Sequence, residues 1–166
     1  DQKAVLPIIY HLFNQKNEAM KKLKFSIQID APQERVWNIL WTDETYRAWT
    51  AAFHPGSYAK SDWKEGSKIL FLGSEGEGMV SKIERLVPNE YMSFQHLGEL
   101  KNGVEDYDSP KVKGWTGAME NYTLHEENGG TKLDVDLDAD ESFADHLEGA
   151  FPKALDKVKE LAEEKG

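Results

Sequence analysis

Apolar and polar residues alternate along much of the chain, beginning with KLKFSIQIDAP at residues 22–32. This stretch places its phenylalanine and isoleucines on one side and its polar residues on the other, which predicts a strand with one covered face. Alternation resumes from about residue 57 to residue 140, broken by turn signals at residues 88–89 and 128–130. The pattern predicts an antiparallel meander whose apolar face needs a covering layer.

Two short helices are predicted directly after the first strand. Pro32 stands at a position that opens helices, and an apolar stripe follows it in QERVWNIL. Thr42 and Asp43 then offer an N-cap for a second helix, which carries Tyr46 and Trp49. The predicted order is therefore strand, helix, helix and then the meander.

A long amphipathic helix is predicted at the C-terminus. Its apolar residues at helical spacing are Leu155, Val158, Leu161 and Ala162. Because no other long helix is predicted after the meander, we expect this one to lie across the apolar face of the sheet. A proline inside a helix costs about 3 kcal/mol. We therefore expect Pro152 to lie at a kink or at a new helix start after Gly149.

Residues before Met20 have a pattern of their own. Apolar residues fall at helical spacing around Pro7, namely Leu6, Ile9, Tyr10 and Phe13. Residues 1–19 are therefore expected to form an N-terminal extension, either a short peripheral helix or a disordered leader. Residues 20–166 have the length of one domain and contain no linker, so a single α+β domain is expected there.

Composition narrows the classes of partner. The chain has 30 acidic and 20 basic side chains, a formal charge of -10, which disfavours nucleic acid and anionic membrane surfaces. It has no cysteine, which excludes disulfides, thiol catalysis and thiolate metal sites. The apolar run AVLPIIYHLF is too short to insert across a membrane and lacks the flanks of a signal peptide. A cytoplasmic location is expected.

The order of predicted elements is that of a helix-grip fold, and several segments resemble one superfamily. These segments are IDAPQERVWNILWTDETYRAW, DWKEGSKILF, RLVPNEYMSFQH, NGGTKLDVDLDAD and FPKALDKVKELAEE. They resemble the START-like superfamily, also called SRPBCC, and most closely the branch similar to the C-terminal domain of the activator of heat shock protein 90 ATPase. The resemblance covers about residues 22–164. It implies a curved antiparallel sheet wrapped around a long C-terminal helix.

The resemblance also implies a cavity between the sheet and the terminal helix that binds an apolar small molecule. The candidate lining residues are Trp41, Trp49, Phe71, His96, Trp115, Glu120, Tyr122 and Phe151. Phe151 stands where this branch usually has tryptophan. Trp115 follows GELKNGVEDYDSPKVKGW, which is long for a hairpin loop and is a candidate lid. For each aromatic residue the plainer alternative is packing in the core.

Two titratable residues are expected on the inner face of the sheet. His96 falls in phase with Phe94, so its imidazole either contacts a ligand, acts as an acid or base, or makes a structural hydrogen bond. Glu120 falls in phase with Tyr122, and burying its charge is costly without a partner. His96 is a plausible partner for Glu120. Whether the two side chains touch depends on the strand order, which the sequence does not give.

Other groupings of polar residues give little indication of a metal, nucleotide or catalytic site. The histidines show no metal-ligand spacing, and DVDLDADESFAD alternates as a solvated strand face without the glycine and glutamate of a calcium loop. GSEGEG is a hairpin turn, since it does not run from a strand into a helix. No Gly-x-Ser-x-Gly nucleophile motif occurs. We therefore expect no metal and no cofactor.

Three functions remain open. The first is non-catalytic binding of an apolar, amphipathic or lipid-like small molecule in the interior. The second, implied by the resemblance, is a module that interacts with a chaperone. The third is a cyclase-like or hydrolase-like enzyme that uses His96 and Glu120.

Overall fold

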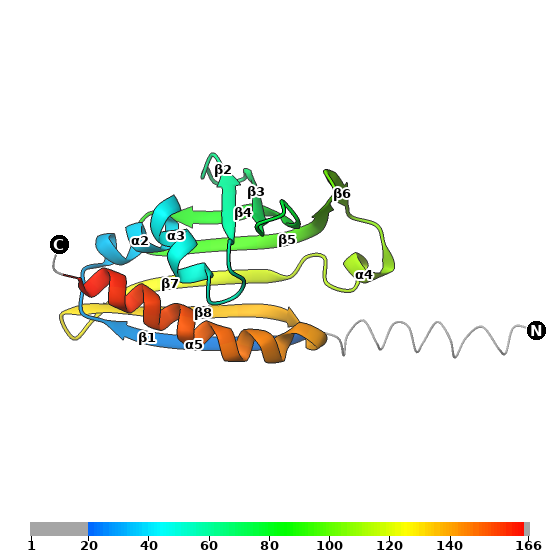
Figure 1. Ribbon diagram of the computed structural model, residues 1–166. Helices are drawn as coiled ribbons and strands as arrows, with labels where there is room; N and C mark the ends of the chain where they lie inside the picture. The colour runs from blue at the N-terminus through cyan, green and yellow to red at the C-terminus, as the bar shows by residue number, and fades with distance from the viewer. Residues whose placement is uncertain (1–19, 165–166) are drawn as a thin grey trace, which may run out of the picture.

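Eight antiparallel strands form one sheet in the computed structural model, which describes residues 20–164 (Figure 1). The strands are β1 (Met20–Ile29), β2 (Tyr58–Ser61), β3 (Lys68–Leu72), β4 (Gly78–Val87), β5 (Tyr91–Lys101), β6 (Val104–Asp106), β7 (Met119–Glu127) and β8 (Gly130–Asp140). Their order is β1-β8-β7-β5-β4-β3-β2, and β6 pairs with β5. The helices are α2 (Gln33–Trp41), α3 (Asp43–Thr50), α4 (Pro110–Lys113) and α5 (Glu141–Glu163). The predicted α+β helix-grip fold is confirmed.

The predicted alternation sets the two faces of the sheet. Val135 on β8 pairs with Phe25 on β1, and Leu133 pairs with Ile27, so their apolar side chains share one face. The turn between β7 and β8 contains Asn128 and Gly129, both with positive φ, as a two-residue hairpin requires. The strand register and the turn residues are therefore both consistent with the same face of the sheet pointing toward the core.

Three helices cover the apolar face, rather than the terminal helix alone. α5 lies along β1 and β8, while α2 and α3 lie beside it over the other half of the sheet (Figure 1). The buried stripe of α5 contains Ala154, Leu155, Val158 and Ala162, as the helical spacing predicted apart from the half-buried Leu161. Because α5 occupies one side, the space over β4 and β5 is closed by side chains from α2, α3 and the loops.

Of the two alternatives predicted for Pro152, a kink or a new helix start after Gly149, the helix start is wrong. α5 begins at Glu141, immediately after β8, and the side chain of Asp140 caps it by accepting a hydrogen bond from Ser142 N. Pro152 lies inside the helix, where its missing N–H costs one hydrogen bond. Apolar residues on both sides of the proline, from Ala144 onward, are buried. Their packing holds the helix together across the proline.

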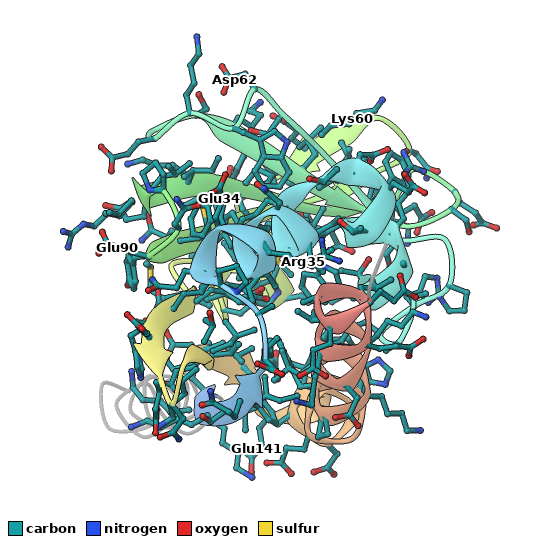
Figure 2. The ribbon with its side chains drawn as sticks, turned by 90° about the vertical axis from the view of Figure 1, so that its left-hand side faces the viewer. Glu34, Arg35, Lys60, Asp62, Glu90 and Glu141 are labelled. Atoms are coloured by element: carbon teal, nitrogen blue, oxygen red, sulfur yellow. The ribbon has the colours of Figure 1, made fainter. Side chains whose placement is uncertain are left out.

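The C-terminal end of α5 is held by Arg35 on α2. The guanidinium donates from Nη2 to the carbonyl oxygens of Glu164 at 2.8 Å and Leu161 at 3.3 Å, and from Nε to that of Ala162. Figure 2 shows Arg35 between α2 and this end of α5. A cation at a helix C-terminus satisfies free carbonyls and opposes the helix dipole favourably. Arg35 therefore fixes α5 to the start of the helical layer.

The expected long loop before Trp115 is largely ordered structure. β5 runs on to Lys101, and a turn at Asn102 and Gly103, both with positive φ, leads into β6. Ser109 then caps the short helix α4, whose Val112 is fully buried. The segment is thus a hairpin and a helical turn packed on the sheet, because the Asn-Gly pair favours a tight hairpin.

One expectation cannot be compared with the structure, and one finding concerns membranes. The helix or leader expected at residues 1–19 lies outside them. None of the helices within residues 20–164 combines the length and the apolar character needed to cross a bilayer.

Candidate functional site

Two inward-facing side chains on neighbouring strands form the centre of the candidate site. Phe94 on β5 is paired with Glu120 on β7, so His96, two residues further along, also lies beside Glu120. His96 Nε2 lies 3.1 Å from Glu120 Oε1, and His96 Nδ1 lies 2.7 Å from Ser81 Oγ on β4. The strand order therefore brings together the pair that the sequence could not join.

Tyr122 completes the contacts of the Glu120 carboxylate. Its hydroxyl donates to Glu120 Oε2 at 2.5 Å. Burial raises the pKa of Glu120, but the hydrogen bond and charge of His96, together with the Tyr122 hydrogen bond, outweigh it and leave that pKa below its ordinary value. Burial and the Glu120 charge raise the pKa of Tyr122 well above its ordinary value. At neutral pH Glu120 is thus an ionised acceptor and Tyr122 a neutral donor.

Sequence reasoning missed two polar residues of the site, Ser81 and Tyr46. Ser81 lies two residues before the buried Ile83, so the alternation of β4 could have placed it inward. Tyr46 lies three residues before Trp49 on α3 and shares its buried face. Burial, and then the negative charge of Glu120, raise the pKa of Tyr46.

Aromatic rings surround this polar group. The Trp41 ring lies 4.9 Å from that of Tyr122 and 5.3 Å from that of Phe94, edge-on to both. The Phe71 ring lies 5.0 Å from that of Phe94 and 5.8 Å from that of His96. Edge-to-face rings at these distances attract one another beyond simple burial. They fill much of the space above β5 and β7.

The rings do not seal the site completely. Phe94 and Tyr122 are fully buried, whereas Phe71 and Trp41 are only partly buried. The Glu120 side chain keeps 20% of its area exposed although it faces the interior. Each of its oxygens accepts one hydrogen bond from the protein and has a further lone pair. The carboxylate can therefore accept a hydrogen bond from another molecule.

The fold and this site can now be compared with known proteins. A sequence model of the family described as Activator of Hsp90 ATPase homolog 1-like protein matches residues 30–163. The chain belongs to this family. The match confirms the resemblance to the heat shock protein 90 activator branch of the START-like superfamily. Among curated proteins, no sequence match to this chain is found.

Solved structures agree on the fold of this family member. Protein MLL2253 from Mesorhizobium loti is 14% identical, with a TM-score of 0.66 over 88% of this chain and 99% of that one. The Aha1 dimer from Colwellia psychrerythraea is 21% identical, with a TM-score of 0.66 and the same coverage. CalU16 from Micromonospora echinospora is 17% identical, with a TM-score of 0.61 over 87% and 77% of the two chains. At these identities the likeness concerns the fold alone.

Most of the predicted lining residues lie in one group. These are Trp41, Trp49, Phe71, His96, Glu120 and Tyr122. Trp49 is fully buried, and its Nε1 donates to Leu40 O, so it packs as a core residue. Phe151 lies apart, stacked on Phe25. Trp115 follows α4 and makes no ring contact with this group.

The site has no metal-binding arrangement. Within residues 20–164, no three His, Asp or Glu side chains come close enough together to hold an ion. The acidic residues of β8 alternate along the strand; Asp138 pairs with Lys22, and Asp136 accepts from the Asn121 amide. The chemistry of the site therefore consists of hydrogen bonding, charge and apolar contact.

Proposed function

We propose that this protein binds an apolar or amphipathic small molecule against the inner face of β5 and β7, with Glu120 as its polar anchor. The observation that carries the proposal is Glu120, whose carboxylate is ionised and whose inward-facing side chain keeps 20% of its area exposed. A carboxylate in an apolar setting gains more from a hydrogen bond than one in water. Its protein partners His96 and Tyr122 hold it in one orientation for a ligand.

The polar groups favour a ligand that carries a hydroxyl group. A hydroxyl can donate to Glu120, since each Glu120 oxygen keeps a free lone pair. The surrounding surface is aromatic, with Trp41 and Phe71 partly exposed beside it. A phenol or an alcohol with a flat apolar body matches both features.

Binding requires some side chains to move. Rings pack at 5–6 Å across the site, as Trp41 and Phe71 do on either side of Phe94. A ligand of more than a few atoms therefore displaces the partly exposed rings rather than entering an empty chamber. Such motion slows association but leaves the fully buried Phe94 and Tyr122 in place.

Native mass spectrometry and ligand-observed NMR with a library of phenols, aliphatic alcohols and fatty acids test the proposal. We expect hydroxyl-bearing aromatic compounds to bind and Glu120→Gln to weaken them about tenfold or more, because a charged acceptor becomes a neutral amide. Glu126→Gln is the matched control, since Glu126 lies on the same strand but is exposed. The proposal fails if no compound binds, or if both variants bind as the wild type does.

The proposal is for binding without turnover. Should a ligand be identified, His96→Gln tests for chemistry, because His96 contacts Glu120 and is the candidate acid or base. The absence of product with either protein agrees with a binding role, whereas turnover that His96→Gln leaves unchanged would remove His96 as the acid or base. Turnover that is present in the wild type and lost in the variant would make the protein an enzyme.

Family membership favours a second candidate, a module that interacts with a chaperone. The family description names an activator of the Hsp90 ATPase. Two large apolar side chains stand exposed on the surface, Val104 at 65% and Phe143 at 54%, and are contact candidates. We expect the ATPase rate of a heat shock protein 90 homologue to rise with this protein and to fall back with Phe143→Ser or Val104→Ser. An unchanged ATPase rate removes this candidate, while Glu120→Gln should not affect it.

A further inference from the structure

A pocket adjoins the Glu120 site and shares Trp41 with it, but Glu120 is not among its lining residues. It has a volume of about 280 Å³ and opens between α2, the β2–β3 connection and the adjoining ends of β4 and β5. Its lining residues are Trp37, Asn38, Trp41, Thr42, Trp63, Leu86 and Met92. Three of the five tryptophans of the chain thus meet at one small pocket.

The indole rings are arranged around Trp41. The ring of Trp37 lies 6.1 Å from it at an interplanar angle of 75°, and the ring of Trp63 lies 5.9 Å from it at 43°. All three are only partly buried, so each presents apolar area to the pocket. Rings that meet at steep angles enclose a rounded group better than a flat one.

Trp63 is held in an unusual backbone conformation. Its φ is 58°, in the left-handed region that a bulky residue rarely adopts. Its N–H is fixed by a 3.0 Å hydrogen bond to Ser61 Oγ. Two residues on, Glu65 Oε1 accepts from Leu86 N at 3.0 Å and ties the loop to β4. The strained conformation is therefore maintained by contacts that keep the indole at the pocket.

The charges of the residues at the pocket favour a positively charged ligand, because the lining within residues 20–164 contains no cation that would repel it. No lysine or arginine lines the pocket in the described part of the chain. The Glu65 carboxylate contacts the backbone of Leu86, which is a lining residue. Figure 2 shows Glu34 on α2, Asp62 in the β2–β3 connection and Glu90 in the β4–β5 turn, with Arg35 beside Glu34 and Lys60 at the end of β2. The whole chain carries a formal charge of -10.

From these features we infer that the pocket binds a small organic cation, of the quaternary ammonium class, through the faces of Trp37, Trp41 and Trp63. An organic cation gains from aromatic faces because the ring quadrupole is negative there, and tryptophan is the best of the rings. A trimethylammonium group is rounded and weakly hydrated, so it loses little on leaving water. Asn38 and Thr42 supply hydrogen-bonding groups for a hydroxyl or carboxylate on the same ligand.

Choline and its neutral isostere 3,3-dimethylbutan-1-ol test the role of charge, since the two differ in little else. Two-dimensional NMR resolves the indole N–H signals of the individual tryptophans. We expect choline to shift the signals of Trp37, Trp41 and Trp63 and to leave that of Trp115 unmoved. The neutral alcohol should bind about tenfold more weakly, because cation–π contacts to two or three rings contribute about that factor.

Variants separate this pocket from the Glu120 site. Trp37→Leu and Trp63→Leu should each weaken choline binding several-fold, while Trp37→Tyr, which keeps an aromatic face, should retain most of it. Trp115→Leu and Glu120→Gln should leave choline binding unchanged. Vesicles of phosphatidylcholine, tested beside free choline, distinguish a lipid headgroup from a free solute as the source of the cation.

Three results would overturn the inference. The first is equal binding of choline and the neutral alcohol, which would make the pocket merely apolar. The second is no indole shift with choline at millimolar concentration. The third is loss of choline binding in Glu120→Gln with Trp37→Leu unaffected, which would assign the cation to the other site.

Discussion

Glu120 illustrates how one residue can remain ionised in an apolar interior. Its two oxygens accept from different residues, His96 and Tyr122, and the far side of the imidazole meets Ser81. His96 Nε2–H donates to the Glu120 carboxylate, while His96 Nδ1 and the Ser81 hydroxyl share a hydrogen bond. Each member then has a partner, which offsets the cost of removing the carboxylate from water.

The lowered pKa of Glu120 predicts a specific acid sensitivity. A carboxyl whose pKa is lower in the folded state adds stability above its unfolded pKa, here near 4.5, and that contribution is lost as the pH falls through the folded pKa. Glu120→Gln should lower the free energy of unfolding by about 1–3 kcal/mol at neutral pH. Below pH 4.5 the difference from the wild type should shrink. Urea unfolding at several pH values measures this, and a constant difference would contradict it.

The raised pKa values of Tyr122 and Tyr46 predict a loss of stability at high pH. Their pKa values are raised in the folded state, so their stabilising contribution is complete below the unfolded value of 10.0 and is lost as the pH rises beyond it. Each raised tyrosine should reduce stability by about 1.4 kcal/mol per pH unit above that value. Tyr122→Phe should remove about half of the combined slope. Absorbance of tyrosinate during unfolding checks it, and an unchanged slope would refute the assignment.

At the scale of elements, Arg35 satisfies free carbonyl groups at the end of α5, as a C-terminal glycine motif does in many helices. Three carbonyl oxygens at the end of α5 accept from its guanidinium. Arg35→Gln should therefore lower the free energy of unfolding by about 1–2 kcal/mol, since charge-assisted hydrogen bonds at a helix end are lost. Arg47→Gln is the control. Arg47 pairs with exposed Asp43 four residues earlier, and such pairs contribute about 0.5 kcal/mol or less.

Pro152 offers a prediction of the opposite sign. It lies inside α5 at an exposed position, so Pro152→Ala restores a backbone donor without changing the core. We expect the thermal midpoint to rise, with a gain of about 1 kcal/mol or more in stability. Lys153→Ala, at the neighbouring exposed position, should change little. A destabilised Pro152→Ala would mean that the helix is shaped around the proline.

The elements that sequence reasoning found are those with strong local signals. Alternation located the long strands, and the residues at 88–89 and 128–130 marked real turns. β6 was missed because its three residues are too few to alternate visibly. The start of α5 was misplaced because Pro152 and Gly149 outweighed the Asp140 cap in the sequence, whereas in the structure burial on both sides of the proline decides.

At the scale of the whole molecule, the site depends on information that no segment contains. The inward phase of His96 and Glu120 followed from alternation, but their contact required β5 and β7 to be neighbours. A bulge in β5 changes its register with β4 between His96 and Gly98, and His96 lies opposite Ser81. Long-range strand pairing depends on the packing of the whole sheet, so local patterns in the sequence do not predict which strands are neighbours.

Phe151 links three parts of the fold and provides a test of how they hold together. Its ring stacks on Phe25 of β1 at 4.7 Å and meets Phe53, after α3, edge-on at 4.7 Å. Phe151→Ala should lower the free energy of unfolding by about 3–5 kcal/mol, because a buried ring is removed and a cavity remains. Trp115→Ala, which truncates a partly buried ring after α4, should cost less.

Two probes of the Phe151→Ala protein show whether the loss is local or global. Since α5 contacts β1, β8, α2 and α3, weakening it should destabilise the whole domain in one transition. Tryptophan fluorescence, which reports mainly on the layer of α2 and α3, and circular dichroism should then give the same urea midpoint. If the fluorescence transition stayed at the wild-type midpoint while the helix signal was lost early, α5 would be a peripheral element. The Glu120 site would then rest on α2 and α3 alone.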